Sequence, residues 1–158
     1  MLKKMRLKDK LIVVLRDKNG NVKHRYDSGW RENTITNSGK AEVAGLICAD
    51  VGGTAFDYIA IGTGTTPESA TDTALENETH RIGGGDVTGS LTTTTVTNDT
   101  VQLVGTFSGY TGTESITESG VFNASSGGTM LCRQTFSAIN VDWDAGDSLQ
   151  ITWKIQVT

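Results

Sequence analysis

The chain has 158 residues, which fits one domain and is enough to bury roughly 68–70% of the unfolded surface. Its net charge is -4 and only 20% of its residues are charged, so it lacks the basic excess expected of a protein that binds nucleic-acid phosphates. Gly is abundant at 19 residues, Pro occurs once, and Thr runs are frequent, a mixture that favours strands and turns.

The N-terminus is basic and then apolar. The apolar run, Leu11 to Leu15, is shorter than the roughly 7–15 residues of a secretory signal core, and no stretch is long enough to span a membrane. We therefore expect a protein made in the cytoplasm, with no membrane partner. The basic leader fits either an arm that docks on an acidic partner or a lysine-protected edge strand; it consists of Lys3, Lys4, Arg6, Lys8 and Lys10.

The first predicted unit is a β-hairpin. Residues 7–16 are rich in Leu, Ile and Val, Asn19-Gly20 is typical of a tight type I′ turn, and residues 21–28 return as the partner strand. A short helix follows near residues 38–49, with Asn37-Ser38-Gly39 as its cap and an apolar stripe at i, i+3 and i+4. The stripe consists of Val43, Leu46 and Ile47.

The middle of the chain is less regular. Residues 56–61 predict a short apolar strand that ends in the loop Gly62-Thr63-Gly64. Residues 69–78, with Thr71 and Asp72 as caps, predict a single helical turn. Glycines 83–85 then form a hinge before the second half.

The second half predicts strands almost throughout. Residues 90–97 and 101–108 form a hairpin joined at Asn98-Asp99, and residues 115–122 pair with 130–136 across the loop 123–129. The clearest strand is the last, where five apolar side chains alternate with polar ones, as in a sheet with one buried face; they are Leu149, Ile151, Trp153, Ile155 and Val157.

These elements predict a mostly β fold, an antiparallel, jelly-roll-like β-sandwich with one short α-helix near residues 38–49. We expect one domain over residues 1–158, in which residues 1–55 supply a hairpin and helix and residues 56–158 a β-rich core. The two cysteines, Cys48 and Cys132, have no zinc-site or disulfide-framework spacing and are expected to be buried free thiols.

Motifs for catalysis are incomplete. Gly62-Thr63-Gly64 lacks the third glycine of a dinucleotide loop and the Lys-Ser/Thr pair of a P-loop. Neither Ser115 nor Ser119 lies in a G-x-S-x-G elbow, and the only histidines are His24 and His80. No acidic pair is singled out as a glycosidase dyad. We expect no enzyme activity and no cofactor.

One cluster has residue types suited to a metal. Glu76, Glu78 and His80 would share one face of an extended strand, with Asp86 nearby. The spacing is unspecific and equally typical of an exposed polar strand face, so no metal site is predicted.

Glu118 and Arg133 lie on the two strands of the predicted 115–136 hairpin. They are candidates for a structural cross-strand ion pair. The alternative is two independent surface charges.

Several segments resemble small structural proteins of tailed bacteriophages, over about two thirds of the chain. They are Tyr58-Ile59-Ala60-Ile61-Gly62-Thr63-Gly64, Pro67, Asp72-Thr73-Ala74-Leu75 with Glu78, Glu118-Ser119-Gly120-Val121-Phe122, Met130-Leu131-Cys132-Arg133-Gln134-Thr135-Phe136, and Gly146-Asp147-Ser148-Leu149. The resemblance implies a virion protein of the head-decoration, head-fibre, collar or tail type. It brings no catalytic residues.

The leading hypothesis is therefore a non-enzymatic virion protein that binds capsid or tail proteins as a symmetric homo-oligomer, with a trimer as one option. The alternative is a receptor- or carbohydrate-binding module for host surface glycans. Its candidate platforms are Trp30, Tyr110 and Trp143, although Trp30 and Trp143 equally fit residues that close the ends of the core.

Overall fold

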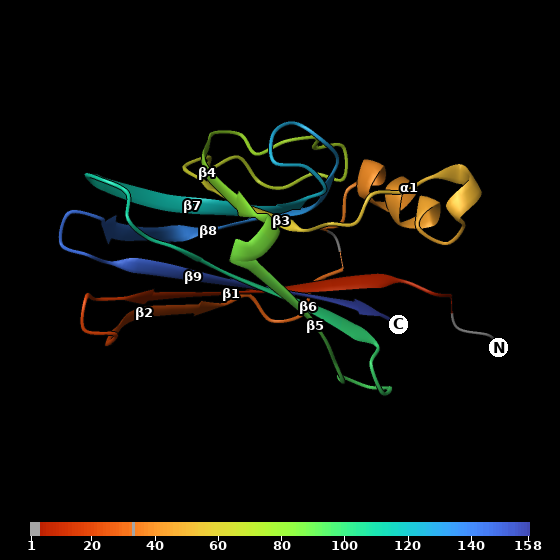
Figure 1. Ribbon diagram of the computed structural model, residues 1–158, viewed down its shortest axis with the longest axis horizontal. Helices are drawn as coiled ribbons and strands as arrows, with labels where there is room; N and C mark the ends of the chain where they lie inside the picture. The colour runs from red at the N-terminus through yellow and green to blue at the C-terminus, as the bar shows by residue number, and fades with distance from the viewer. Residues whose placement is uncertain (1–3, 33) are drawn as a thin grey trace.

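The chain folds into two antiparallel β-sheets packed face to face (Figure 1). This computed structural model describes residues 4–32 and 34–158. The five-stranded sheet has the order β2-β1-β9-β6-β5, and the four-stranded sheet has the order β4-β3-β7-β8. The predicted β-sandwich is confirmed. Its strands are β1 (Leu7–Arg16), β2 (Val22–Asp27), β3 (Tyr58–Gly62), β4 (Glu78–Gly83), β5 (Val87–Thr92), β6 (Thr100–Phe107), β7 (Thr113–Phe122), β8 (Met130–Asp142) and β9 (Ser148–Val157).

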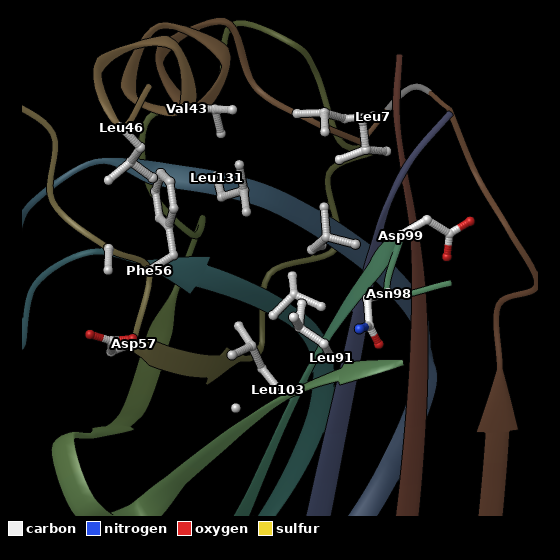
Figure 2. A pocket seen from close by; sticks show the side chains of 15 residues that line it. Leu7, Val43, Leu46, Phe56, Asp57, Leu91, Asn98, Asp99, Leu103 and Leu131 are labelled. Carbon is white, nitrogen blue, oxygen red and sulfur yellow. The ribbon is translucent and has the colours of Figure 1, made fainter. Parts of the chain in front are cut away.

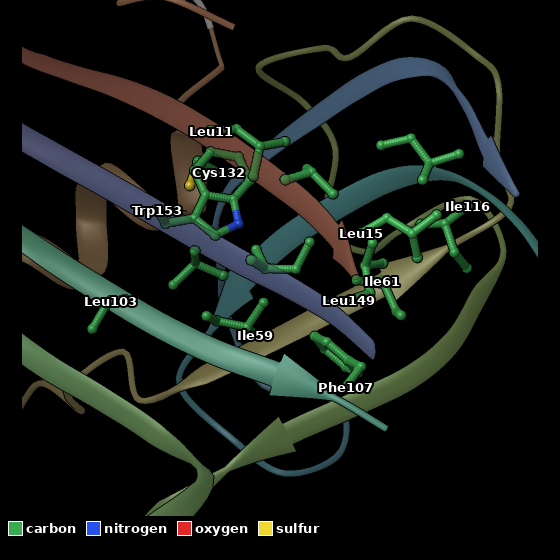
Figure 3. Close-up of a cluster of buried hydrophobic side chains, with 14 of the residues drawn as sticks. Leu11, Leu15, Ile59, Ile61, Leu103, Phe107, Ile116, Cys132, Leu149 and Trp153 are labelled. Carbon is green, nitrogen blue, oxygen red and sulfur yellow. The ribbon is translucent and has the colours of Figure 1, made fainter. Parts of the chain in front are cut away.

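The core lies between the sheets (Figure 3). In the five-stranded sheet, Trp153 of β9 is paired with Leu11 of β1 on one side and Leu103 of β6 on the other. The four-stranded sheet contributes Ile59 and Ile61, both fully buried. Because alternate residues of each strand face inward, the two sheets bury one continuous apolar layer.

The alternation predicted for β9 holds up to Ile155. At the strand end the pattern reverses, since Val157 is 47% exposed and Gln156 only 4% exposed. Gln156 is buried because its Nε2 donates to Thr95 Oγ1 and Asp99 Oδ2 in the loop that follows β5. A polar partner from another segment thus overrides the strand periodicity at this position.

The N-terminal hairpin forms, but the type I′ turn is wrong. Such a turn needs positive φ at both central residues, whereas only Gly20 of this turn has positive φ, at 86°. The Gly20 N–H donates to the Asp17 carbonyl, and the Asp17 carboxylate accepts the N–H groups of Asn19 and Asn21. The acidic side chain therefore selects a longer turn.

The helix is shorter than predicted. Helix α1 spans Asn37–Gly45, and its N-cap is Thr36, whose Oγ1 accepts the Gly39 N–H at 2.9 Å. After α1 the chain turns through a 3-10 segment, η1 (Ala49–Val51), and at Gly52-Gly53 packs back closely on Gly45. Helix α1 thus ends at Gly45, so the predicted continuation to residue 49 is wrong. Cys48, which was predicted to be buried, is exposed, whereas Cys132 is buried as predicted.

Three connections also differ from prediction. The β5–β6 hairpin pairs Thr92 with Thr100, so its loop spans residues 93–99 and is not a two-residue turn. Residues 69–78 form no helical turn; Asp72 Oδ2 instead accepts the Ser69 N–H. The glycine segment is a 3-10 turn, η2 (Gly84–Asp86), through which the chain passes from one sheet to the other.

Replacing Trp153 with Ala should lower the free energy of unfolding by about 3–5 kcal/mol, because it opens a cavity in the fully buried centre. Val157→Ala, on the exposed end of the same strand, is the matched control and should change stability little. Urea titration of both variants measures the difference, and equal losses would contradict the burial pattern of β9.

Candidate functional site

An apolar cleft opens at one end of the sandwich (Figure 2). It has a volume of about 410 Å³. Val43 of α1, Leu46 just after α1 and Phe56 of the segment before β3 form one wall, and Leu91 and Leu103 form the facing wall. Elements from both sheets and the helix therefore build one recess, which is lined mainly by aliphatic side chains.

Exposed apolar side chains cluster around this cleft. Leu91 of β5 is 63% exposed, and Leu46, Val101 and Val157 of the lining are also open to solvent. Ile47 and Val51, which follow α1, are exposed as well. Exposed apolar area concentrated around one recess is typical of a surface that contacts another molecule.

The rim of the cleft carries two carboxylates, Asp57 and Asp99. Partial desolvation raises the pKa of Asp99, but the N–H groups of Val96, Thr94 and Thr95, together with Gln156, outweigh it and hold this pKa far below its usual value. Asp99 is thus a fixed negative charge that orders the 93–99 loop. Apart from these carboxylates, the lining is mainly aliphatic, so the cleft suits the binding of an apolar group.

The structure brings Glu118 and Arg133 together in a buried network. Arg133 Nε donates to Glu118 Oε2 at 2.8 Å, and both side chains are shielded from solvent. Glu118 also accepts the backbone N–H groups of Gly64, Glu76 and Asn77 at 2.8–3.1 Å. All four of these bonds go to one carboxylate, which therefore anchors the loop between β3 and β4.

Arg133 binds that loop at two further points. Its Nη1 donates to Asp72 Oδ2 and its Nη2 to the Thr66 carbonyl, both at 3.0 Å. Burial lowers the pKa of Arg133, but the contacts with Glu118 and Asp72 outweigh it and raise this pKa above the usual value. Arg133 therefore stays a cation inside the network.

The three candidate aromatic platforms do not form one surface. Tyr110 and Trp143 lie near each other, with ring centroids 5.2 Å apart, and Tyr110 stacks on His80. Trp143 is only 4% exposed, and its Nε1 donates to Glu114 Oε2. Trp30 is exposed and, among the described residues, has no ring contact with this group. Within the group of His80, Tyr110 and Trp143, His80 and Tyr110 are partly exposed and Trp143 is buried.

The possible metal cluster is dispersed. His80 Nε2 lies 2.8 Å from Glu114 Oε2, Glu78 pairs with Arg81, and Glu76 binds Thr65 and Thr66. Within residues 4–32 and 34–158, no three metal-ligating side chains of the His, Cys, Asp or Glu type gather. Each of these carboxylates has a structural partner instead.

The motifs considered for catalysis have internal roles. The buried Ser119 hydroxyl donates to the Ala60 carbonyl and accepts from Trp153 Nε1. The Gly64 N–H, which would have to face a phosphate, is bonded to Glu118. His24 is an exposed residue of β2.

Sequence patterns missed a buried acid, Asp9. It lies on β1 in the same inward-facing series as Leu11. The alternation of β1 could therefore have predicted that Asp9 is buried. Its Oδ1 accepts from Gln134 Nε2 and its Oδ2 from Thr34 Oγ1. Desolvation raises the Asp9 pKa from its usual 3.8 to about 7, with Gln134 and Arg31 acting in the opposite direction.

No protein-family model, curated protein or solved structure matches this sequence. In the part of the chain that the structure describes, no helix is both long and apolar enough to cross a membrane. The site must therefore be interpreted from its own geometry.

Glu118→Gln should lower the free energy of unfolding by about 3–5 kcal/mol, because it leaves Arg133 buried without its main counter-charge. Arg133→Met should cost a similar amount. The double variant should cost much less than both singles together, which a double-mutant cycle in urea measures. Strict additivity would contradict the coupling, and Glu32→Gln, in the exposed pair with Arg6, should have little effect.

Asp9 should make the fold less stable as the pH rises from about 4 to 7. Unfolded Asp9 loses its proton near 3.8, whereas folded Asp9 keeps it to about 7, so the unfolded state binds fewer protons in this window. At about 1.4 kcal/mol per pKa unit, the loss reaches about 4 kcal/mol.

Asp9→Asn should remove this loss, since the amide stays neutral. Urea unfolding at several pH values tests it. The control is Asp17→Asn, where the pKa lies below the usual value, and which should keep the decline between pH 4 and 7. An unchanged decline in Asp9→Asn would contradict the role of Asp9.

Proposed function

We propose that this chain is a non-enzymatic structural protein of a tailed-bacteriophage virion, which assembles on the capsid or tail as a decoration, collar or tail component. The observation that carries the proposal is the apolar cleft with its exposed rim, a surface suited to protein contact. The resemblance to phage structural proteins is the reason for proposing a virion as the place where the chain assembles.

Three of the segments that carry the resemblance meet in the four-stranded sheet. Residues 58–64 form β3 and its exit, residues 118–122 end β7, and residues 130–136 begin β8; these strands are neighbours. A Cβ on Gly64 would lie 2.5 Å from Glu118 Oε1, so the glycine leaves room for the carboxylate. These motif residues thus hold the loop between β3 and β4 on the sheet.

Residues 1–55 contribute to the contact surface. Leu7 lines the cleft from β1, Val43 lines it from α1, and Leu46 lines it from the position that caps the C-terminus of α1. The part of the chain outside the resemblance therefore supplies much of one wall. This suits a shared sandwich whose N-terminal region adapts it to a particular capsid or tail partner.

Mass spectrometry of gradient-purified particles tests the proposal. The chain should be present at a fixed ratio to the major capsid protein, and immunogold labelling should place it on head or tail. A chain that is expressed during infection but stays in the soluble lysate, away from the particles, would contradict it.

A second candidate is binding of host glycans, favoured by the Tyr110–His80 stack, whose ring centroids lie 3.7 Å apart. Tyr110 and His80 are both partly exposed, and an accessible aromatic face suits the apolar side of a sugar ring. Tyr110→Ala should then abolish binding on a glycan array while leaving the folded state intact. Trp30→Ala, at an exposed ring elsewhere, is the control; an array with no binding by the wild-type protein would count against this function.

A further inference from the structure

We infer that β5 and the cleft beside it form a self-association surface, where two copies of this chain pair their β5 strands antiparallel about a twofold axis. The inference goes beyond the proposed function, because the pairing uses only the chain's own surface. Its outcome is therefore independent of whether the chain is found in a virion.

The edge strands of the two sheets differ in how they are protected. Free edges are usually blocked by charges, proline or a covering segment. Edge strand β2 carries a charged run, Lys23 to Arg25, and edge strand β4 carries Glu78 and Arg81. Strand β5, with the sequence VTGSLT, has no charge and no proline.

The remaining edge, β8, is partly covered and polar where open. Its first half is bridged by the segment 34–36, through the Ile35–Cys132 bridge and the Thr36 N–H to the Leu131 carbonyl. Its exposed later positions are small or polar, at residues 137, 138 and 140. Among the four edges, β5 is the one that combines an uncharged strand with a large exposed apolar side chain, Leu91.

Charge favours a second copy at β5. A twofold axis places each strand against itself, so a charged edge would set like charges opposite one another, which is unfavourable. Pairing of β2 with its own copy would oppose the cations of Lys23 and Arg25. Pairing of β5 opposes only neutral residues, Val87 to Thr92.

The cleft adds apolar contact to this edge. Gly89 and Leu91 line it from β5 (Figure 2), so these alternate positions face the recess. A β5 strand added from a second copy extends the five-stranded sheet and brings its own alternate side chains to the same face. The pairing then covers Leu91 and satisfies the outer backbone groups of β5.

Sedimentation equilibrium over a range of concentrations tests this. Wild-type protein should approach twice the chain mass of 16.8 kDa. Ser90→Lys adds a charge to the edge, and Leu91→Lys adds one beside the cleft; both positions are exposed, so the folded state should persist, as circular dichroism will check. Each should raise the dimer dissociation constant by about tenfold or more. Val22→Lys, at an exposed position of β2, should leave it unchanged.

Wild-type protein that stays monomeric at all concentrations would overturn the inference. So would a trimer or larger assembly in place of a dimer. A dimer that Ser90→Lys and Leu91→Lys weaken no more than Val22→Lys would also overturn it, since the contact would then lie elsewhere.

Discussion

Glu118 is a carboxylate that is fully shielded from solvent, and the loop from β3 to β4 packs around it. An ionised group in an apolar interior is tolerated only when its oxygens are fully bonded. Here three backbone N–H groups and Arg133 supply those bonds. The loop must therefore be in place whenever the sheet is folded, which couples a long connection to the four-stranded sheet.

This constraint explains why the motif residues lie far apart in sequence. Gly64 gives Glu118 room, Arg133 reaches across from β8, and Asp72 holds the far side of the guanidinium. The charged network joins β7 and β8 to the loop between β3 and β4. The apolar cleft instead opens between α1 and the five-stranded sheet. The buried network and the cleft lining thus consist of different residues, so we expect that the cleft surface can vary without loss of the network.

Sequence patterns predicted the sandwich because strand alternation is a local signal. The series from Leu149 to Ile155 and the hairpin of β7 and β8 were visible for this reason. The pairing of residue types at Glu118 and Arg133 was visible too, but the backbone donors of Gly64 and Asn77 were not, because they come from another segment. The turns were predicted least well, because side-chain hydrogen bonds of Asp17 and Asp99 set the conformation of their loops. Residue spacing does not reveal such bonds.

The cleft could not be predicted from sequence patterns, because its walls come from elements far apart in the sequence, including β1, α1, β5, β6 and β9. We propose that this apolar end is where the protein meets its partners. Amide hydrogen exchange, compared between the dilute protein and its assembled form, tests this most directly. Protection should rise in Val87–Thr92 and around α1, and protection confined to β2 or the Tyr110 end of the molecule would contradict the claim.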